Sequence, residues 1–350
     1  MTANKMSRIM KIFKLLIILS FLLQACTSLH TRHLESDARI IVSEFIYDEA
    51  PFPQCHASTI LETDSGLMAA WFGGTYESHP DVSIYVSTRQ QGEWSDPMLV
   101  ADGIQNDSLR YPCWNPVLVK RDNGDIILFY KAGPNPREWW GCYKVLAAGE
   151  KNWSASQRLP DSFLGPVKNK SFELTDGTYL HPSSFETNEK WGICLEKSDQ
   201  ELGKWERTEI DNRHFNAIQP AILKHKKKTL QMLCRSRENR IVESWSYDLG
   251  KSWTPLAETG LVNNNSGIDA VTLRNGLHLL VCNPIEKGRN KLSLLVSPDG
   301  KEWKELLVLE DQPLGEFSYP AIIEDKDGTV HITYTYNRVK IKYLTVSINS

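Results

Sequence analysis

The chain has 350 residues, of which 41% are hydrophobic and 24% are charged, so it can form one large domain or two ordinary ones around a sizeable core. Its formal net charge of -3 offers no bulk attraction to nucleic acid, and we expect no nucleic-acid partner. Eleven tryptophans are a high number, and their spacing bears on the fold.

The first 25 residues have the features of an export signal. A basic stretch precedes the apolar run 15–23, which is too short to span a bilayer as a helix. The run ends in Leu-Gln-Ala-Cys26, which resembles a bacterial lipobox; the alternative is an ordinary signal peptide followed by a chance cysteine. We expect residues 1–25 to be removed, residues 26–38 to form a lipidated tether, and residues 39–350 to fold. The protein would then be an exported lipoprotein, anchored in a membrane and facing the periplasm or the cell exterior.

The six cysteines after Cys26 are widely spaced in a large domain. An exported protein can form disulfides, but buried free thiols suit this spacing better. No CxxC or HExxH spacing is present, so we expect no metal site and no cofactor. The six are Cys55, Cys113, Cys142, Cys194, Cys234 and Cys282.

A short motif recurs six times, at spacings of roughly 50 to 60 residues. Each copy has a polar residue, a small residue or proline, and a short apolar strand. The copies begin at His56, Asn115, Lys170, Gln219, Asp269 and Tyr319. Most copies are followed by a turn and a second strand, as at Asp122-Asn-Gly and Asp327-Gly, and such turns between apolar runs indicate β-hairpins.

A second series of tryptophans lies later in each repeat and keeps step with the first. Its members are Trp94, Trp153, Trp205, Trp253 and Trp303. A unit of roughly 50 residues holds four short strands, which is the size of a propeller blade. The sequence therefore predicts an all-β, six-bladed β-propeller. We expect residues 39–45 to add a strand to the last blade and close the ring, because an open ring would leave strand edges unpaired.

Residues 246–253, Ser-Tyr-Asp-Leu-Gly-Lys-Ser-Trp, match the Asp-box of sialidases, S-x-D-x-G-x-x-W, in full. Residues 297–303 are a shortened copy, and degenerate copies precede Trp94 and Trp205. The Asp and Ser side chains of such a motif can bond backbone N–H groups of a turn, and the Trp can pack between blades, so the motif is structural. The chain resembles sialidase-like BNR-repeat proteins over about residues 40–348.

In a propeller the first strand of each blade lines the axis, so the six polar residues that begin the first motif would converge on one mouth of the ring. The resemblance to sialidases implies specific roles at that mouth. Sialidases hold the substrate carboxylate with three arginines, and they use an Asp acid/base and a Tyr nucleophile assisted by a Glu. Tyr319 matches the nucleophile, and Arg235 and Arg289 match two of the arginines. Asp81 best matches the acid/base, with Glu77 and His79 as rivals.

Two positions depart from the family pattern. Cys55-His56-Ala57 stands where the first arginine, in Arg-Ile-Pro, is expected. Gln219 replaces the assisting Glu and cannot take a proton, which leaves His56 or Asp269 to activate Tyr319. Further candidate contacts with substrate are Gln219, Asn115, Lys170, Arg237, Arg110 and His79. Arg235 and Arg237 could instead form surface ion pairs, and the others could be ordinary solvated or structural groups.

These observations predict an exo-glycosidase that removes a terminal acidic sugar, either sialic acid or a uronic or ketodeoxy acid, from a glycan. Two alternatives stay open. One is a propeller polysaccharide lyase acting on uronic acids, because other propellers pair His and Tyr for proton abstraction. The other is a propeller that binds glycans without catalysis.

Overall fold

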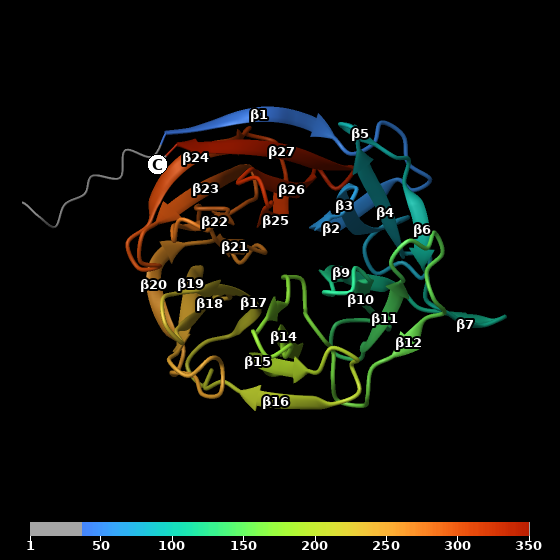
Figure 1. The fold of residues 1–350 in the computed structure, drawn as a ribbon, viewed down its shortest axis with the longest axis horizontal. Coiled ribbons are helices and arrows are strands. Elements are labelled where there is room, and N and C mark those ends of the chain that lie inside the picture. Colours follow the sequence, from blue (N-terminus) through green and yellow to red (C-terminus); the bar gives the residue numbers. More distant parts are fainter. Residues whose placement is uncertain (1–36, 350) are drawn as a thin grey trace, which may run out of the picture. The chain divides into compact units, whose positions relative to one another are not determined.

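The computed structural model describes residues 37–349, and every regular element in that range is a β-strand (Figure 1). No helix in this part of the chain is long and apolar enough to cross a membrane. The predicted signal segment and the predicted lipidation of Cys26 lie outside the described residues.

Six antiparallel sheets surround a central axis, as the two repeat series predict (Figure 1). Blade 1 holds β2 (Gln54–Thr63), β3 (Gly66–Gly74), β4 (Ser83–Gln90), β5 (Glu93–Trp94) and β6 (Met98–Ala101), and blade 2 holds β9 (Cys113–Lys120), β10 (Ile126–Ala132), β11 (Trp140–Leu146) and β12 (Gln157–Arg158). Blade 3 holds β13 (Phe172–Glu173), β14 (Tyr179–Glu186), β15 (Trp191–Ser198) and β16 (Trp205–Glu209), and blade 4 holds β17 (Ala217–Lys224), β18 (Leu230–Ser236), β19 (Arg240–Ser246) and β20 (Ala257–Val262). Blade 5 holds β21 (Asp269–Thr272), β22 (His278–Cys282), β23 (Lys291–Ser297) and β24 (Lys304–Asp311), and blade 6 holds β25 (Phe317–Glu324), β26 (Val330–Tyr336), β27 (Lys340–Asn349) and β1 (Asp37–Phe45).

The ring closes as predicted, because β1 from the start of the fold pairs with β27 from its end. The outermost strand of blade 6 therefore comes from the opposite end of the chain to its other three strands, and this pairing leaves no gap in the ring (Figure 1). A separate hairpin of β7 (Ile104–Asn106) and β8 (Leu109–Arg110) projects from the ring beside blade 1.

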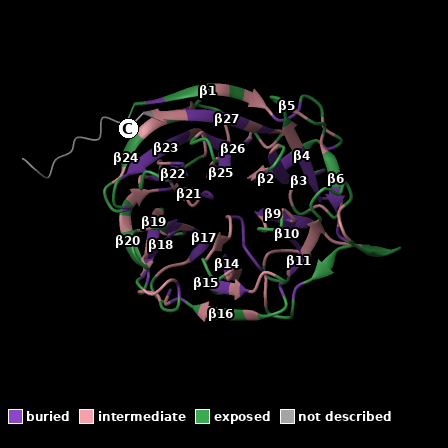
Figure 2. Cartoon of the chain, in the orientation of Figure 1, coloured by how far each residue is buried: buried purple, intermediate pink, exposed green. Residues whose placement is uncertain are grey.

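The hydrophobic core is divided among the boundaries between blades. Residues 37–349 hold six buried apolar clusters, and each cluster joins two neighbouring blades, with Tyr319 of blade 6 added to the cluster between blades 1 and 2. The five tryptophans of the second series each pack against one of these clusters, as the sequence predicts. Burial is concentrated in the inner strands, and the outer strands are largely exposed (Figure 2).

The full Asp-box forms the turn between β19 and β20, at the outer side of blade 4. Ser246 Oγ accepts a hydrogen bond from the N–H of Gly250 at 2.8 Å, and Asp248 Oδ1 accepts one from the N–H of Lys251 at 3.0 Å. Gly250 has a φ of 79°, which favours glycine. The shortened copy at residues 297–303 repeats these bonds. The motif is structural here, as its chemistry predicts.

All six described cysteines are buried and free, so the prediction of buried thiols is confirmed.

Candidate active site

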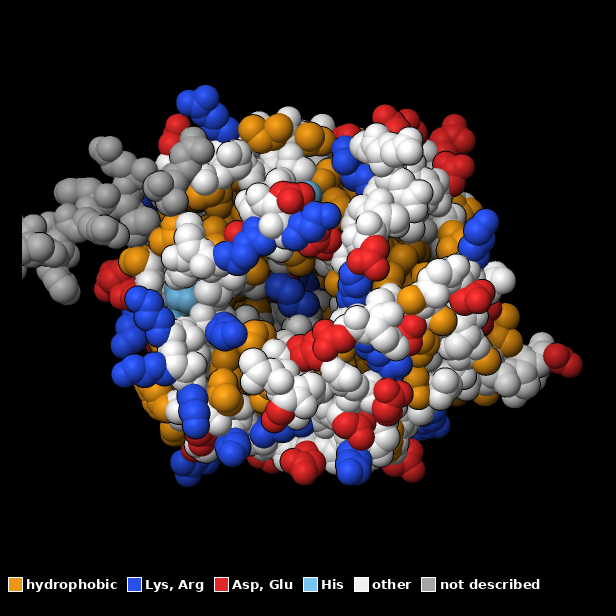
Figure 3. All heavy atoms as spheres, viewed as in Figure 1, with side chains coloured by type: hydrophobic (Ala, Val, Ile, Leu, Met, Phe, Trp, Pro, Cys, Tyr) orange, Lys and Arg blue, Asp and Glu red, His pale blue; other side chains and the backbone are white. Residues whose placement is uncertain are grey.

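One end of the ring gathers the polar groups that the sequence singles out. The inner strands begin at this end, and the hairpins between the second and third strands of the blades turn here, as the pairings of β2 with β3 and of β3 with β4 show. Viewed down the axis, the molecule has a central hollow with Lys and Arg side chains on its floor and rim (Figure 3).

A shared backbone feature aims side chains into this hollow. In five of the six blades, one non-glycine residue at the start of the inner strand has φ between 40° and 76°. In blades 1, 2, 4 and 6 the register with the second strand shifts at this residue, which is a β-bulge. The five residues are Ala57, Asn115, Lys168, Gln219 and Tyr319.

Of the six residues predicted to begin the inner strands, three have this positive φ, namely Asn115, Gln219 and Tyr319. In two other blades a neighbouring residue has it instead. Ala57 takes the position expected for His56, and Lys168 takes the position expected for Lys170. Asp269 begins β21 in ordinary extended backbone. A bulge adds one residue on one strand, so residues beside it change the direction of their side chains.

Tyr319 is held among groups from three other blades. Its phenol oxygen accepts a 2.6 Å hydrogen bond from Arg235 Nη1, and its ring centroid lies 4.1 Å from that of His56. The guanidinium carbon of Arg289 lies 5.6 Å from the centre of the Tyr319 ring. A Cβ atom at Gly267 would come within 3.1 Å of the ring, so glycine allows this close packing. Tyr319 is 8% exposed, with its oxygen toward the cationic side chains.

Arg235 is a buried cation without a carboxylate partner. The residue is 7% exposed, and no described Asp or Glu oxygen lies within ion-pair distance of it. Its other close neighbour is the ring of Trp191, whose centre lies 5.4 Å from the guanidinium carbon. Its Nε has no hydrogen-bond partner among the described residues. Because burying an unpaired charge is costly, this arrangement favours binding of an anion.

Arg289 belongs to a network that brings a third arginine to the site. Glu316 Oε1 accepts from Arg289 Nη1 at 3.0 Å and from Arg338 Nε at 2.8 Å. Arg338 also forms an ion pair with Glu77. Burial raises the pKa of Glu316, but the hydrogen bonds and charges of the two arginines outweigh that effect and lower it overall. Three arginines and two carboxylates leave one positive charge for a ligand to neutralise.

Arg338 lies next to the position where the family's first arginine is missing. It sits in the turn between β26 and β27, and its carbonyl oxygen accepts a 2.7 Å hydrogen bond from the N–H of Cys55. Its charge acts on Cys55 and on His56. Blade 6 therefore brings a guanidinium to the place where blade 1 carries no arginine of its own.

His56 is neutral at physiological pH. Burial lowers its pKa well below the ordinary value, and the charges of nearby arginines and Lys168 lower it further. Nδ1 lies 3.0 Å from Thr335 Oγ1, whereas Nε2 has no partner among the described residues. A neutral imidazole with a free nitrogen beside Tyr319 can accept or return a proton.

Asp81 lies in a second group, on the loop between β3 and β4. It accepts hydrogen bonds from the Thr75 N–H at 3.0 Å and from Thr75 Oγ1 at 2.6 Å, and it pairs with His79 at 2.7 Å. Partial burial raises the pKa of Asp81, but the bonds from Thr75 and His79 outweigh that effect and lower it overall. Arg110 supports the same loop, because its Nη2 donates to the Asp81 carbonyl at 2.9 Å and to Ser83 Oγ at 2.7 Å.

Asp269 forms its described hydrogen bonds with groups other than Tyr319. Both of its carboxylate oxygens accept from Lys170 Nζ at 2.8 Å, and Oδ2 also accepts from the N–H of Ile322 at 2.9 Å. The structure therefore pairs the buried Asp269 with the half-buried Lys170, and it leaves His56, whose ring packs on that of Tyr319, as the candidate to take its proton. Gln219 and Asn115 are buried at their bulges.

Lys168 is a buried cation that bonds groups from several blades. Its Nζ donates to the carbonyl of Ile268 at 2.8 Å, in the segment just before β21, to Asn169 Oδ1 at 2.9 Å and to the carbonyl of Pro320 in blade 6. Asn169 in turn donates to the carbonyl of Gln219 at 2.9 Å. These bonds link blades 3 to 6 and include the residue that follows Tyr319.

The sequence did not single out Arg338, Glu316, Lys168 or Trp191. Glu316 comes three residues before Tyr319, which the family resemblance identifies. Asn337 and Arg338 form a left-handed turn between two apolar strands, and an Asn in such a turn is a sequence signal that could have directed attention to Arg338. Arg237 stands at the rim, where its guanidinium carbon lies 4.0 Å from the centre of the Trp191 ring.

Comparisons with known proteins agree with this architecture. The family model described as "BNR repeat-like domain" matches residues 65–332. A protein of unknown function from Dyadobacter fermentans has a similar structure, with a TM-score of 0.74 and 14% identity over 89% of this chain and 99% of that one. The NanB sialidase of Streptococcus pneumoniae, as its K499G mutant, gives a TM-score of 0.68 and 12% identity over 86% and 70%. Trypanosoma rangeli sialidase gives a TM-score of 0.68 and 15% identity over 85% of this chain and 55% of that one. Comparison with curated proteins found no match.

Proposed function

Because the chain belongs to the BNR repeat-like domain family, and its fold is that of sialidases, we propose that it is an exo-glycosidase that removes a terminal acidic sugar from a glycan. The observation that carries this proposal is Arg235, a buried cation with no described carboxylate partner that donates to Tyr319. A substrate carboxylate would supply the missing negative charge, and a guanidinium can bond both of its oxygens.

In the proposed reaction Tyr319 is the nucleophile. Its oxygen attacks the anomeric carbon, the bond to the leaving-group oxygen breaks, and that oxygen takes a proton from Asp81. Water then cleaves the covalent intermediate, with Asp81 as the base. A neutral phenol does not repel an acidic sugar as a carboxylate nucleophile would. Arg235 would stabilise negative charge on the phenol oxygen, and the neighbouring imidazole of His56, whose Nε2 has no described partner, would accept the proton.

The lowered pKa of Asp81 sets one condition on this mechanism. At neutral pH the carboxyl is ionised, so it must gain a proton before it acts as the acid. A sugar bound over the loop between β3 and β4 would displace water from Asp81 and raise its pKa toward the range suited to general acid catalysis.

A lyase acting on uronic acids is the second candidate, and the contact between His56 and Tyr319 favours it. In that reaction one of the two groups would take the proton from C5 of the sugar, and no covalent intermediate would form. A release assay on sialosides and uronic-acid glycans separates the candidates. We expect a free reducing sugar. An unsaturated product absorbing in the ultraviolet would indicate the lyase, and binding without any product would indicate a glycan-binding propeller.

We also propose that the protein is exported and held at a membrane by lipid on Cys26. The lipobox-like sequence before Cys26 supports this proposal. Cys26→Ala should move the protein from the membrane fraction to the soluble fraction after cell lysis. A variant that still sediments with membranes would refute the lipid anchor.

A further inference from the structure

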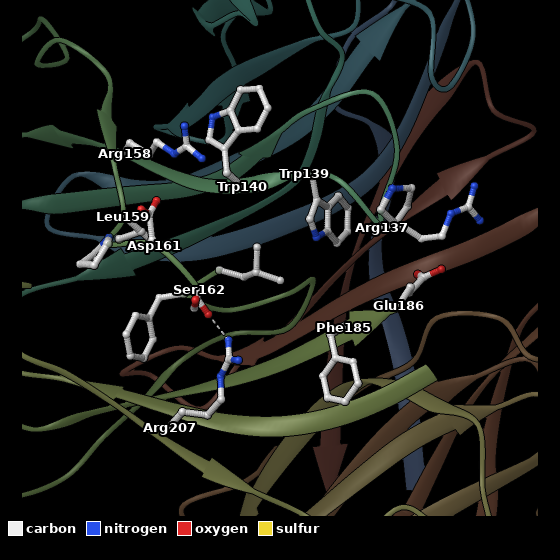
Figure 4. Close-up of a pocket in the computed structure, with 14 residues that line it drawn as sticks. Arg137, Trp139, Trp140, Arg158, Leu159, Asp161, Ser162, Phe185, Glu186 and Arg207 are labelled. Atoms are coloured by element: carbon white, nitrogen blue, oxygen red, sulfur yellow. Dashed lines mark hydrogen bonds between the residues drawn. The ribbon is translucent and has the colours of Figure 1, made fainter. Parts of the chain in front are cut away.

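A pocket of about 260 Å³ opens between blades 2 and 3, outside the site described above (Figure 4). Trp139 and Arg137 reach it from the loop between β10 and β11, and Glu186 reaches it from the end of β14. Phe163 lines it from the segment between β12 and β13. The two hairpins that contribute to it turn at the same end of the ring as Tyr319, and Arg158 of β12 and Arg207 of β16 line its outer side.

A short series of contacts joins this pocket to Tyr319. Glu186 lies opposite Trp191 in the register of β14 and β15. The Trp191 ring packs on Arg235, and Arg235 donates to Tyr319. The charges of Arg235 and Arg237 act directly on Glu186, where they oppose the rise in its pKa that burial causes. The pocket therefore lies close to the groups that surround Tyr319, separated from them by Trp191 and Arg235.

The pocket carries no surplus charge, in contrast to the hollow. Its charged lining residues are Arg137, Arg158, Arg207, Asp161 and Glu186. Arg207 is paired with the buried Glu196 at 2.7 Å, behind the pocket wall. The other two arginines, Arg137 and Arg158, and the two acids, Asp161 and Glu186, have a net charge of zero. A second acidic sugar would gain nothing here, whereas a neutral sugar would meet both donors and acceptors for its hydroxyl groups.

The remaining lining suits the two kinds of surface that a sugar ring presents. Trp139 points into the pocket from one wall, and Arg137 and Glu186 lie together at one end (Figure 4). Aromatic rings pack against the apolar C–H faces of a sugar, and the charged groups can bond its hydroxyl edge. A small number of polar groups in an otherwise apolar pocket is the usual composition of a ligand site.

We propose that this pocket binds the neutral sugar to which the terminal acidic sugar is linked, an inference that rests on the proposed function. The leaving group of the reaction would then be held by Trp139, Arg137 and Glu186 while Tyr319 attacks. Extended glycans would be better substrates than simple glycosides of the same acidic sugar.

Binding of lactose, a neutral disaccharide, to the full chain tests this inference without relying on catalysis. We expect wild type to bind lactose in a calorimetric titration and to show saturation transfer to its protons by NMR. Trp139→Ala and Arg137→Ala should each weaken binding about tenfold. Tyr247→Ala is the matched control, because Tyr247 is 67% exposed in the Asp-box turn at the opposite end of the ring. Arg137→Ala is included because Trp139 packs edge-to-face on Trp114 and its loss could loosen the loop.

Wild type that does not bind lactose, or variants that bind it as well as the control does, would overturn the inference. On whichever acidic glycoside is cleaved, both variants should also reduce kcat/KM for the disaccharide glycoside relative to the methyl glycoside by about tenfold. Lactose binding in the pocket without cleavage of any acidic glycoside would count against the proposed function and leave the pocket as a glycan site.

Discussion

The three arginines that surround Tyr319 differ in whether a carboxylate already pairs with them. Arg289 and Arg338 share Glu316, and Arg338 also pairs with Glu77. Arg235 has no such partner among the described residues and is the most buried of the three. Ionic bonds to a substrate would therefore depend most on Arg235, because binding there requires no existing ion pair to break.

Replacing Arg235 with Met should reduce kcat/KM for an acidic glycoside by roughly 30- to 1,000-fold, or about 2–4 kcal/mol, as expected for loss of a desolvated charged contact. Arg289→Met should also reduce kcat/KM for the acidic glycoside, by a smaller factor. The same measurement on the methyl ester of the substrate, which lacks the carboxylate charge, should show little difference between wild type and Arg289→Met. Arg235→Met should lose less activity on the ester than on the acid, although it still loses the bond to the Tyr319 oxygen. Arg274→Ala, in the turn between β21 and β22 at the other end of the ring, is the control. Equal losses on acid and ester would show that Arg235 does not bind the carboxylate.

Single elements of this fold were predictable where a pattern repeats. Two series of residues in step gave the number of blades, and the Asp-box gave the turn between β19 and β20. The apolar run near residue 40 gave the closing strand. Each of these features depends on local sequence: a hairpin turn, an alternation of side chains or a short side-chain-to-backbone motif.

The site was less predictable, for two physical reasons. A bulge changes side-chain direction by one residue, and residues 55–58 and 168–170 give no local signal of where it falls. Arg338 meets Glu77 across a separation of 261 residues, because ring closure brings blade 6 beside blade 1. Tyr319, Arg235 and Arg289 came from the family resemblance, whereas Arg338 required the three-dimensional structure.

Removing the Asp-box carboxylate should affect stability and leave the site unchanged. Asp248 accepts hydrogen bonds from the N–H groups of Lys251 and Ser252 and from Ser252 Oγ, and these bonds lower its pKa to about 2. Asp248→Ala should lower the free energy of unfolding by about 1–2 kcal/mol, the usual cost of losing a side-chain cap on backbone N–H groups. Urea unfolding measures the loss, and kcat/KM should stay within a factor of about two. A large loss of activity with normal stability would contradict a purely structural motif.

Buried histidines make the whole molecule sensitive to mild acid. Burial lowers the pKa of His181 to about 3 and that of His278 to about 4. The unfolded chain takes up protons on these side chains below about pH 6.5, whereas the folded protein does not, so stability falls as the pH falls. Each histidine should contribute about 1.4 kcal/mol of lost stability per pH unit between pH 6.5 and about 4.5.

Urea unfolding at pH 7.0, 5.5 and 4.5 measures this effect. The carboxylates with lowered pKa values, such as Asp248 and Asp325, begin to add to the loss only near pH 4.5, where the unfolded chain starts to take up protons on its carboxyl groups. The change between pH 7.0 and 5.5 therefore reports the histidines. His181→Asn should reduce the dependence of unfolding free energy on pH, although it also loses the bonds of His181 to Ser171 and Ser198. A flat profile for wild type would mean that these histidines are not held neutral by burial.

The central claim is that Tyr319 attacks an acidic sugar held by Arg235 in the hollow of the propeller. Mass spectrometry after treatment with a fluorinated inactivator of the sugar that the release assay identifies tests this claim most directly. The account predicts a glycosyl adduct on the peptide that contains Tyr319, and no adduct on that peptide in Tyr319→Phe. An unsaturated product with no adduct, or an adduct on another residue, would contradict it.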